Sequence, residues 1–313
     1  MRRQLVRFAC FSLLLALAHP PAAPAQTTAR LTILHSNDTH GHLLPFSYPA
    51  IAPAGSVIDT LPERREIGGI ARRATLARQV RSQLAAGGVA VWLIDAGDFS
   101  DGTPFSTEYR GEADVAAMNA AGYDLATLGN HEFNYPLAHV RHLLSLMEHP
   151  VLAANVLDRD TSQPLTAPSR VIRVGPVRVG VFGLVTHEAR TYPAVKEGLT
   201  VLDETETARR MVADLRTRAD IVILISHCGD DVDERLAAEV PGIDVIVGGH
   251  SHARLPLGSF VWRSDDMTTD GVNGTVVAQA FQWGGELGRL DLLFRKGADG
   301  WTVDRYRSRL LPV

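Results

Sequence analysis

Cysteine is nearly absent from this chain of 313 residues, which contains only Cys10 and Cys228. Cys10 lies in an N-terminal segment that we expect to be removed, so one cysteine remains and an internal disulfide bond is excluded. Structural zinc sites are typically formed by several cysteines that coordinate the ion, so the cysteine count excludes a zinc site of that kind as well. A chain of this length can instead be stabilised by burying a large apolar core.

Long hydrophobic runs are also lacking, and the clearest apolar run extends only from Phe8 to Ala18. The run is too short to span a bilayer. Three arginines precede it, and the small residues Ala23-Pro24-Ala25 follow it. This arrangement is typical of a secretory signal peptide. We therefore expect residues 1–25 to be a signal peptide and residues 26–313 to form one domain that is periplasmic or secreted.

Basic side chains are outnumbered by acidic ones. Residues 26–313 contain 28 Lys and Arg against 35 Asp and Glu, which gives a formal charge of −7. Surfaces that bind nucleic acid are normally basic. We therefore expect no nucleic-acid polymer and no membrane as partners, and the sequence leaves the oligomeric state open.

Short apolar runs rich in β-branched residues alternate with stretches of helical spacing, a pattern typical of an α/β fold. The predicted strands are Leu31–His35, Val89–Ile94, Tyr123–Leu128, Val177–Leu184, Ile221–Ile225 and Val245–Val247. The predicted helices are Ile70–Leu84, Glu112–Ala121, Pro136–Met147 and Thr205–Arg218.

Polar residues that can bind a metal follow most of these predicted strands. The segments are Asn37-Asp38-Thr39-His40-Gly41-His42, Asp95-Ala96-Gly97-Asp98, Gly129-Asn130-His131-Glu132, Ser226-His227-Cys228-Gly229 and Gly248-Gly249-His250-Ser251-His252. Ligands of α/β sheets bind at the carboxyl ends of the strands, so we expect these segments to converge. His35, His42 and His187 are possible contacts of such a site, whereas we expect His139, His142 and His149 to be solvated or hydrogen-bonded.

The residue types in these segments indicate metal chemistry. Aspartate, asparagine and histidine without cysteine suit zinc, manganese, iron or cobalt better than calcium, which prefers oxygen ligands alone. There are more such residues than one tetrahedral ion needs. A pair of ions that shares one carboxylate accounts for the surplus, and such pairs hydrolyse phosphate esters.

These motifs together resemble the metallophosphoesterase (calcineurin-like) domain of the periplasmic 5′-nucleotidase and 2′,3′-cyclic-nucleotide phosphodiesterase family. The stretches Gly68-Gly69-Ile70-Ala71-Arg72, Ala153-Ala154-Asn155-Val156 and Gly183-Leu184-Val185-Thr186 add to the resemblance. The resemblance implies a layered β-sheet sandwich flanked by helices. It also implies a metal-dependent hydrolase of phosphate esters, with nucleotides as the expected substrates.

The resemblance further implies roles for individual residues. Asp38, His40 and His252 would bind the first ion, Asn130, His227 and His250 the second, and Asp98 would bridge the two. A metal-bound water or hydroxide would be the nucleophile. His131 would be catalytic, either stabilising the phosphoryl oxygens or protonating the departing alkoxide.

The chain departs from the family pattern in two respects. The best-known 5′-nucleotidases have an aspartate three residues after the catalytic histidine, whereas this chain has Asn134, as in the cyclic-nucleotide phosphodiesterase branch. Asparagine can accept a hydrogen bond but supplies no charge, so we expect His131 to be less basic or to be held by another group. The family's C-terminal nucleotide-binding domain also has no counterpart here, and we expect it to be absent.

Two alternatives to a phosphoesterase remain open. One is a hydrolase of a different bond on the same scaffold, such as a thiosulfohydrolase. The other is a metal- or phosphate-binding module without catalysis. A binding module would be expected to have lost Asp98 or His131, and both are present.

Overall fold

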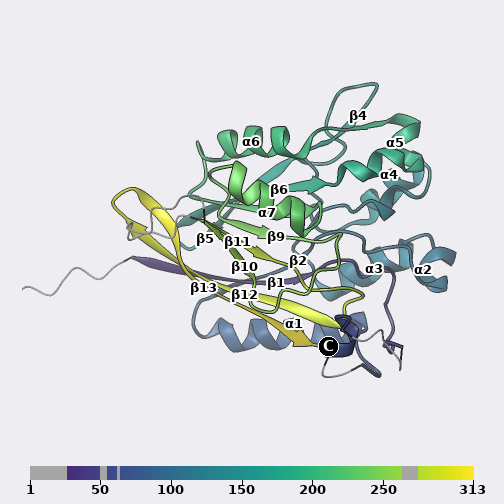
Figure 1. Ribbon diagram of the computed structural model, residues 1–313, viewed down its shortest axis with the longest axis horizontal. Helices are drawn as coiled ribbons and strands as arrows, with labels where there is room; N and C mark the ends of the chain where they lie inside the picture. Colours follow the sequence, from purple (N-terminus) through teal and green to yellow (C-terminus); the bar gives the residue numbers. More distant parts are fainter. Residues whose placement is uncertain (1–26, 50–54, 62–63, 263–273) are drawn as a thin grey trace, which may run out of the picture.

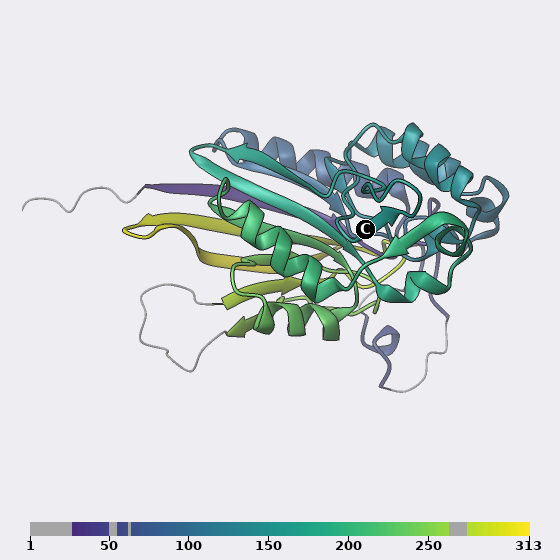
Figure 2. The ribbon, with the colours of Figure 1, turned by 90° about the horizontal axis from the view of Figure 1, so that it is seen from above.

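The computed structural model describes residues 27–49, 55–61, 64–262 and 274–313, so the expected signal peptide lies outside the described residues. Two β-sheets pack face to face, with helices on the outer side of each (Figures 1 and 2). The predicted α/β class and the layered sandwich are confirmed. No helix in the described part of the chain is long and apolar enough to cross a membrane.

The first sheet combines segments from both ends of the chain. Its strands, in spatial order, are β13 (Gly300–Pro312), β12 (Glu286–Gly297), β1 (Thr28–Ser36), β2 (Ala90–Asp95) and β3 (Leu125–Ala126). Strands β1, β2 and β3 are parallel, whereas β12 runs antiparallel to β1 and to β13. The three parallel strands therefore end at the same edge.

The second sheet has six strands. In spatial order they are β10 (Ser259–Trp262), β11 (Gly274–Ala278), β9 (Val245–Val247), β8 (Ile221–His227), β6 (Val177–Val185) and β5 (Ser169–Val174). Strands β6, β8, β9 and β11 are parallel, and β5 and β10 are antiparallel at the edges. A separate antiparallel pair consists of β4 (Val156–Asp158) and β7 (Leu199–Val201).

Along the central strands, successive side chains alternate between two buried cores, and this alternation explains the layered arrangement of sheets and helices. In β8, Ile221, Ile223 and Ile225 belong to the core between the sheets, whereas Val222 and Leu224 belong to the core under the outer helices. Successive side chains of a strand point to opposite faces. A strand with cores on both faces therefore reads as a continuous apolar run, which is why the sequence predicts it.

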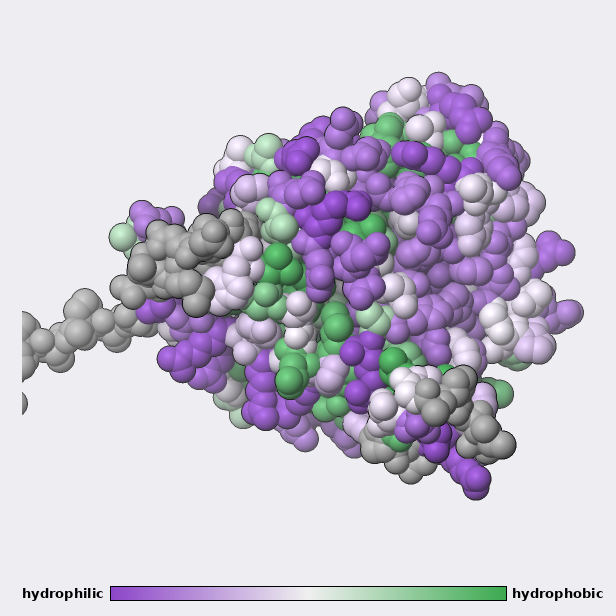
Figure 3. Space-filling model, viewed as in Figure 1, coloured by the Kyte–Doolittle hydropathy of each residue, from purple (hydrophilic) through white to green (hydrophobic). Residues whose placement is uncertain are grey.

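Helices cover the outer face of each sheet. Beside the first sheet lie α1 (Ile70–Ala85), α3 (Glu112–Ala121) and α4 (Leu137–Leu146), which share one buried cluster with Leu34 and Leu93. On the second sheet lie α6 (Glu204–Leu215) and α7 (Asp230–Glu239). Two short helices, α2 (Pro104–Glu108) and α5 (Pro193–Gly198), lie in the connections. Figure 3 shows a mostly hydrophilic face on which apolar side chains form small groups.

The predicted strands and helices all occur. The bounds of Glu112–Ala121 and Val245–Val247 are as predicted, the other elements have shifted ends, and the clearest correction concerns β3. The sequence predicts a strand over Tyr123–Leu128, but β3 pairs with β2 only through Ile94–Leu125 and Asp95–Ala126. Strand β2 itself ends at Asp95, so no partner continues the ladder. The sequence analysis also missed α7, β5 and the strands that follow β9.

Candidate metal centre

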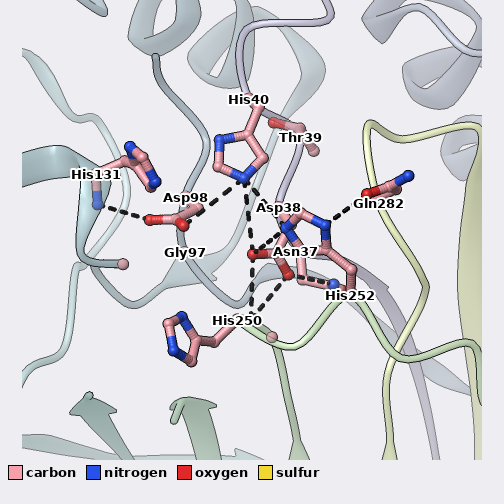
Figure 4. Close-up of polar contacts among 12 residues, drawn as sticks. Asn37, Asp38, Thr39, His40, Gly97, Asp98, His131, His250, His252 and Gln282 are labelled. Atoms are coloured by element: carbon pink, nitrogen blue, oxygen red, sulfur yellow. Dashed lines mark hydrogen bonds and ion pairs between the residues drawn. The ribbon is translucent and has the colours of Figure 1, made fainter. Parts of the chain in front are cut away.

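The predicted metal-binding residues meet at the carboxyl ends of the two sheets. Asp38 and His40 follow β1, Asp98 follows β2, and Asn130 follows β3. From the second sheet, His227 is the last residue of β8, and His250 and His252 follow β9. Figure 4 shows the side chains of Asp38, His40, Asp98, His250 and His252 gathered around a common centre.

The side chains form three overlapping groups that could each hold a metal ion, and two of them, which share no residue, match the predicted ligands; the third consists of His40, Asp98 and His131. The candidate ligand atoms of Asp38, His40 and His252 all lie within 4.8 Å of one another, and so do those of Asp98, His227 and His250. Asp98 joins the groups, because its Oδ2 lies 3.2 Å from His227 Nε2 and 3.8 Å from His40 Nε2.

Three of the histidines have one ring nitrogen occupied by a hydrogen bond. The Nδ1 atoms of His40 and His227 lie 2.9 and 2.7 Å from the carbonyl oxygens of Asp101 and Ala96. The Nδ1 atom of His252 is bonded to Gln282 Oε1. A proton on Nδ1 leaves Nε2 as the ring atom that can bind a metal, which is the arrangement that orients metal-binding histidines. The Nε2 atoms of His40 and His252 lie 3.3 Å apart.

Two buried polar atoms of this site, Asn130 Oδ1 and His227 Nε2, make no hydrogen bond to the described residues, although His227 Nε2 lies 3.2 Å from Asp98 Oδ2. The amide nitrogen of Asn130 donates to the Tyr192 hydroxyl at 2.6 Å, which leaves the oxygen as the free end of the amide. An unpaired buried polar atom is costly and usually has a functional reason. A divalent ion would satisfy both atoms, so this site fits a metal with nitrogen and oxygen ligands.

His227 and Asp98 interact strongly in this buried setting. Burial by itself would lower the pKa of His227, but the carboxylates of Asp98 and Asp38 outweigh burial and raise the pKa to about 10. Burial also opposes ionisation of Asp98, yet the charges of His227 and His40 hold its pKa below its ordinary value. The site is therefore built to keep the Asp98 carboxylate ionised.

The backbone of the site adopts an uncommon conformation. Five of the seven predicted ligands are non-glycine residues with positive φ, namely Asp38, His40, Asp98, His250 and His252, with φ between 44° and 79°. Such residues cost free energy and persist only where the surrounding structure holds them. Hydrogen bonds between loops do so here: Asp38 N donates to Gly97 O at 2.9 Å, and His40 N donates to Asp98 O at 3.0 Å.

Glu132 joins two of the loops and was not identified from the sequence. Its Oε2 accepts from Asp98 N and Gly129 N at 3.0 and 2.7 Å, and its Oε1 accepts from Ser100 N and Oγ at 3.1 and 2.9 Å. A side chain at Gly129 would place its Cβ 2.0 Å from Asp98 Oδ1, so only glycine fits this approach. Glu132 therefore fixes the position of Asp98 relative to Asn130.

The predicted catalytic residue His131 stands at the rim of the site. Its backbone N donates to Asp98 Oδ1 at 2.9 Å, and its side chain is 35% exposed. The ring centroid lies 5.1 Å from that of His40 (Figure 4). Asn134 Nδ2 lies 2.9 Å from His131 Nδ1 and also donates to Asp101 Oδ2. Asn134 thus contacts the histidine through its amide nitrogen, not as the hydrogen-bond acceptor that the sequence suggested, and Asp101 was not predicted to take part.

The remaining histidines lie outside the ligand groups. His187 bonds to Glu204, His42 stacks on Trp283, and His35 is buried beside β12. His139 bonds to Arg110 O and His142 contacts Glu112, as expected of solvated residues. For His149 the expectation is wrong, because this side chain is buried and neither ring nitrogen is bonded. Burial lowers its pKa to about 4.

The fold and the grouped side chains define a class of protein, the metal-dependent phosphoester hydrolases. The family model described as calcineurin-like phosphoesterase matches residues 31–254, and the chain belongs to this family.

Curated relatives include nucleotide hydrolases. The chain is 30% identical to a 5′-nucleotidase of Vibrio cholerae serotype O1, over 96% of this chain and 56% of the relative. It is 28% identical to a 2′,3′-cyclic-nucleotide 2′-phosphodiesterase/3′-nucleotidase of Salmonella typhimurium, over 91% of this chain and 46% of the relative. The chain therefore spans about half the length of these curated relatives.

Solved structures of similar fold include enzymes for two kinds of substrate. A 5′-nucleotidase precursor from Thermus thermophilus has a TM-score of 0.75 and 30% identity, covering 91% of this chain and 54% of that one. The sulfate thiohydrolase SoxB of the same genus also has a TM-score of 0.75, with 25% identity, covering 90% of this chain and 56% of that one.

Proposed function

We propose that this chain is a periplasmic or secreted phosphoesterase that uses two divalent ions to hydrolyse nucleotides or similar phosphate esters. The observation that supports it most is the position of Asp98, whose Oδ2 faces His227 on one side and His40 on the other. A carboxylate between two groups of ligands could serve both ions and would offset part of their charge.

In this proposal, each group of side chains holds one ion. Asp38, His40 and His252 would hold the first ion, Asn130, His227 and His250 would hold the second, and Asp98 would serve both. The unpaired Oδ1 of Asn130 and the position of His227 Nε2 beside Asp98 Oδ2 support the second group. Bound divalent ions would neutralise the phosphate charge and lower the pKa of a water to near neutrality.

His131 then acts on the substrate rather than on a metal. Its partly exposed ring beside Asp98 is within reach of a phosphate ester bound at the centre. Departure of an alkoxide requires a proton, and a protonated imidazole ring can donate one near neutral pH. His131 is therefore assigned as the proton donor to the leaving group, oriented by Asn134.

The substrate class rests on the relatives. Both curated relatives named above act on nucleotides by their names, one at a 5′-phosphate and one at cyclic or 3′-phosphates. Hydrolysis of a thiosulfate conjugate is the second candidate, favoured by the equal TM-score of the sulfate thiohydrolase. The candidate ions are zinc, manganese, iron and cobalt, and this choice rests on the ligand types alone.

The proposed location rests on the N-terminal sequence. Residues 1–25 are proposed to be the signal peptide and residues 26–313 the catalytic domain. N-terminal sequencing of the exported chain tests this, because the proposal requires the mature chain to begin at Gln26.

One assay separates the candidate functions. The purified chain, loaded with manganese or zinc, is incubated with 5′-, 3′- and 2′,3′-cyclic nucleotides and with a thiosulfate conjugate, and phosphate and sulfate release are measured. We expect phosphate release that Asp98→Asn abolishes. Sulfate release alone would favour the thiosulfohydrolase, and bound metal without any release would favour a binding module.

A further inference from the structure

Asp101 brings a carboxylate close to Nδ1 of His131. Asn134 Nδ2 donates a hydrogen bond to Asp101 Oδ2, and the same nitrogen lies 2.9 Å from His131 Nδ1. Asp101 Oδ2 itself lies 3.6 Å from His131 Nδ1. A carboxylate, an amide and an imidazole therefore form one continuous set of contacts.

The arrangement determines which ring nitrogen of His131 faces the substrate. Nδ1 of His131 faces Asn134 and Asp101, so Nε2 is the ring nitrogen left for the leaving oxygen. Proton donation starts from the imidazolium: the Nε2–H bond breaks, and the ring is left neutral with its remaining proton on Nδ1, beside the Asp101 carboxylate. Because Asn134 is neutral, the nearest negative charge on this side of the ring comes from Asp101.

Several hydrogen bonds fix the position of Asp101 beside His131. Its Oδ1 accepts from Thr107 Oγ1 at 3.3 Å, and its backbone N donates to Ser106 Oγ at 2.9 Å. Its carbonyl oxygen accepts from His40 Nδ1 at 2.9 Å. Its φ is +61°, a strained value for a residue other than glycine, and these contacts hold the residue in that conformation.

We propose that Asp101 is the positioning residue of His131: it fixes the Asn134 amide, and through it the ring, and supplies the charge that Asn134 lacks. The proposal rests on the proposed function, because it takes His131 as the proton donor. Asp101 touches neither the substrate nor the ions and acts only through His131 and Asn134.

The first test moves the carboxylate between the two positions. Asp101→Asn removes the charge, and the double variant Asp101→Asn with Asn134→Asp returns it three residues after His131. We expect Asp101→Asn to lower kcat on a 5′-nucleotide by about 10–100-fold, the usual loss for a group that orients a site residue. KM should stay within about twofold, and the double variant should recover most of the loss.

The leaving group provides a second readout. Nitrophenolate departs without a proton, whereas a ribose alkoxide needs one. Asp101→Asn should therefore reduce hydrolysis of p-nitrophenyl phosphate only a few-fold while reducing nucleotide hydrolysis strongly. Asp160→Asn, which removes the same charge from an exposed site, is the matched control and should change neither rate.

Metal content and a spectroscopic signal separate this proposal from the proposed function. Elemental analysis of Asp101→Asn should match the wild type; loss of an ion would mean that Asp101 acts through His40 and would overturn the proposal. The ¹⁵N shifts of the His131 ring, measured in the zinc-loaded, histidine-labelled chain, should change in Asp101→Asn whether or not the chain turns over. Unchanged shifts, a kcat within twofold of wild type, or equal losses on both substrates would each overturn it. A wild type without activity on any phosphate ester would instead refute the proposed function.

Discussion

His227 Nε2 lies 3.2 Å from Asp98 Oδ2, although the two residues are 129 positions apart and follow strands of different sheets. The contact joins the two halves of the sandwich at the site. Since the carboxylates raise the pKa of His227 to about 10, a divalent ion has to displace a proton from this ring when it binds. The same two atoms are proposed to become ligands of one ion.

Asp98→Asn should lower the metal content and abolish turnover. The variant keeps the size of the side chain but loses the charge that offsets two dications. We expect fewer than two ions per chain by elemental analysis and no measurable phosphate release. A variant that retains both ions would show that Asp98 is not the bridge.

His131→Ala should separate catalysis from metal binding. The His131 ring contacts His40 and Asn134. Because its proposed role is to protonate the leaving group and not to bind an ion, the metal content of the variant should equal that of the wild type. The rate should fall by about 10²–10⁴-fold, the usual contribution of a positioned acid–base group. If an ion were lost as well, His131 would have to be counted among the ligands, as its grouping with His40 and Asp98 would allow.

Glu132→Ala should destabilise the chain and loosen the site. The substitution leaves three buried backbone N–H groups and the Ser100 hydroxyl without their acceptor. Because unsatisfied buried donors are costly, we expect the free energy of unfolding to fall by about 2–4 kcal/mol, together with weaker metal binding. Glu132→Gln keeps one acceptor oxygen and is the matched control, with a smaller loss. Equal stability of Glu132→Ala and the wild type in urea would contradict this role.

Asp114 should make stability depend on pH. Burial raises its pKa from 3.8 to about 6, against the hydrogen bond that Ser106 Oγ donates to it at 2.6 Å. The folded chain therefore holds this proton more tightly than the unfolded chain, and Asp114 costs stability as the pH rises through this window.

The variant Asp114→Asn removes this dependence. Its free energy of unfolding relative to the wild type should increase between about pH 4 and pH 7, by on the order of 2–3 kcal/mol. Urea denaturation at several pH values measures the difference, with Asp160→Asn as the control. A difference that is the same at every pH would contradict the assigned shift.

The sequence predicts the interior of this fold better than its edges. Strands such as Ile221–His227 are buried on both faces, so their apolar runs are unmistakable. Strand β12 was missed because only one residue in two is deeply buried, although Leu290, Leu292 and Phe294 do alternate with more exposed residues. A search for that alternation would have identified the hairpin of β12 and β13.

The site shows the same division. The predicted ligands converge because each follows a buried strand, and strand ends can be read from the sequence. Asp101, Glu132 and Tyr192 could not be assigned in this way. Asp101 and Asn134 are 33 residues apart and meet only because the loops after β2 and β3 pack together. Side chains that act through such tertiary contacts leave no local pattern.

The number of ions that activity requires tests the central claim most directly. The chain is stripped of metal with a chelator and titrated with manganese or zinc, while bound metal and phosphate release from a nucleotide are followed together. The account predicts that bound metal saturates at two ions per chain and that activity reaches its plateau at the same point. Saturation and full activity at one ion per chain would contradict it.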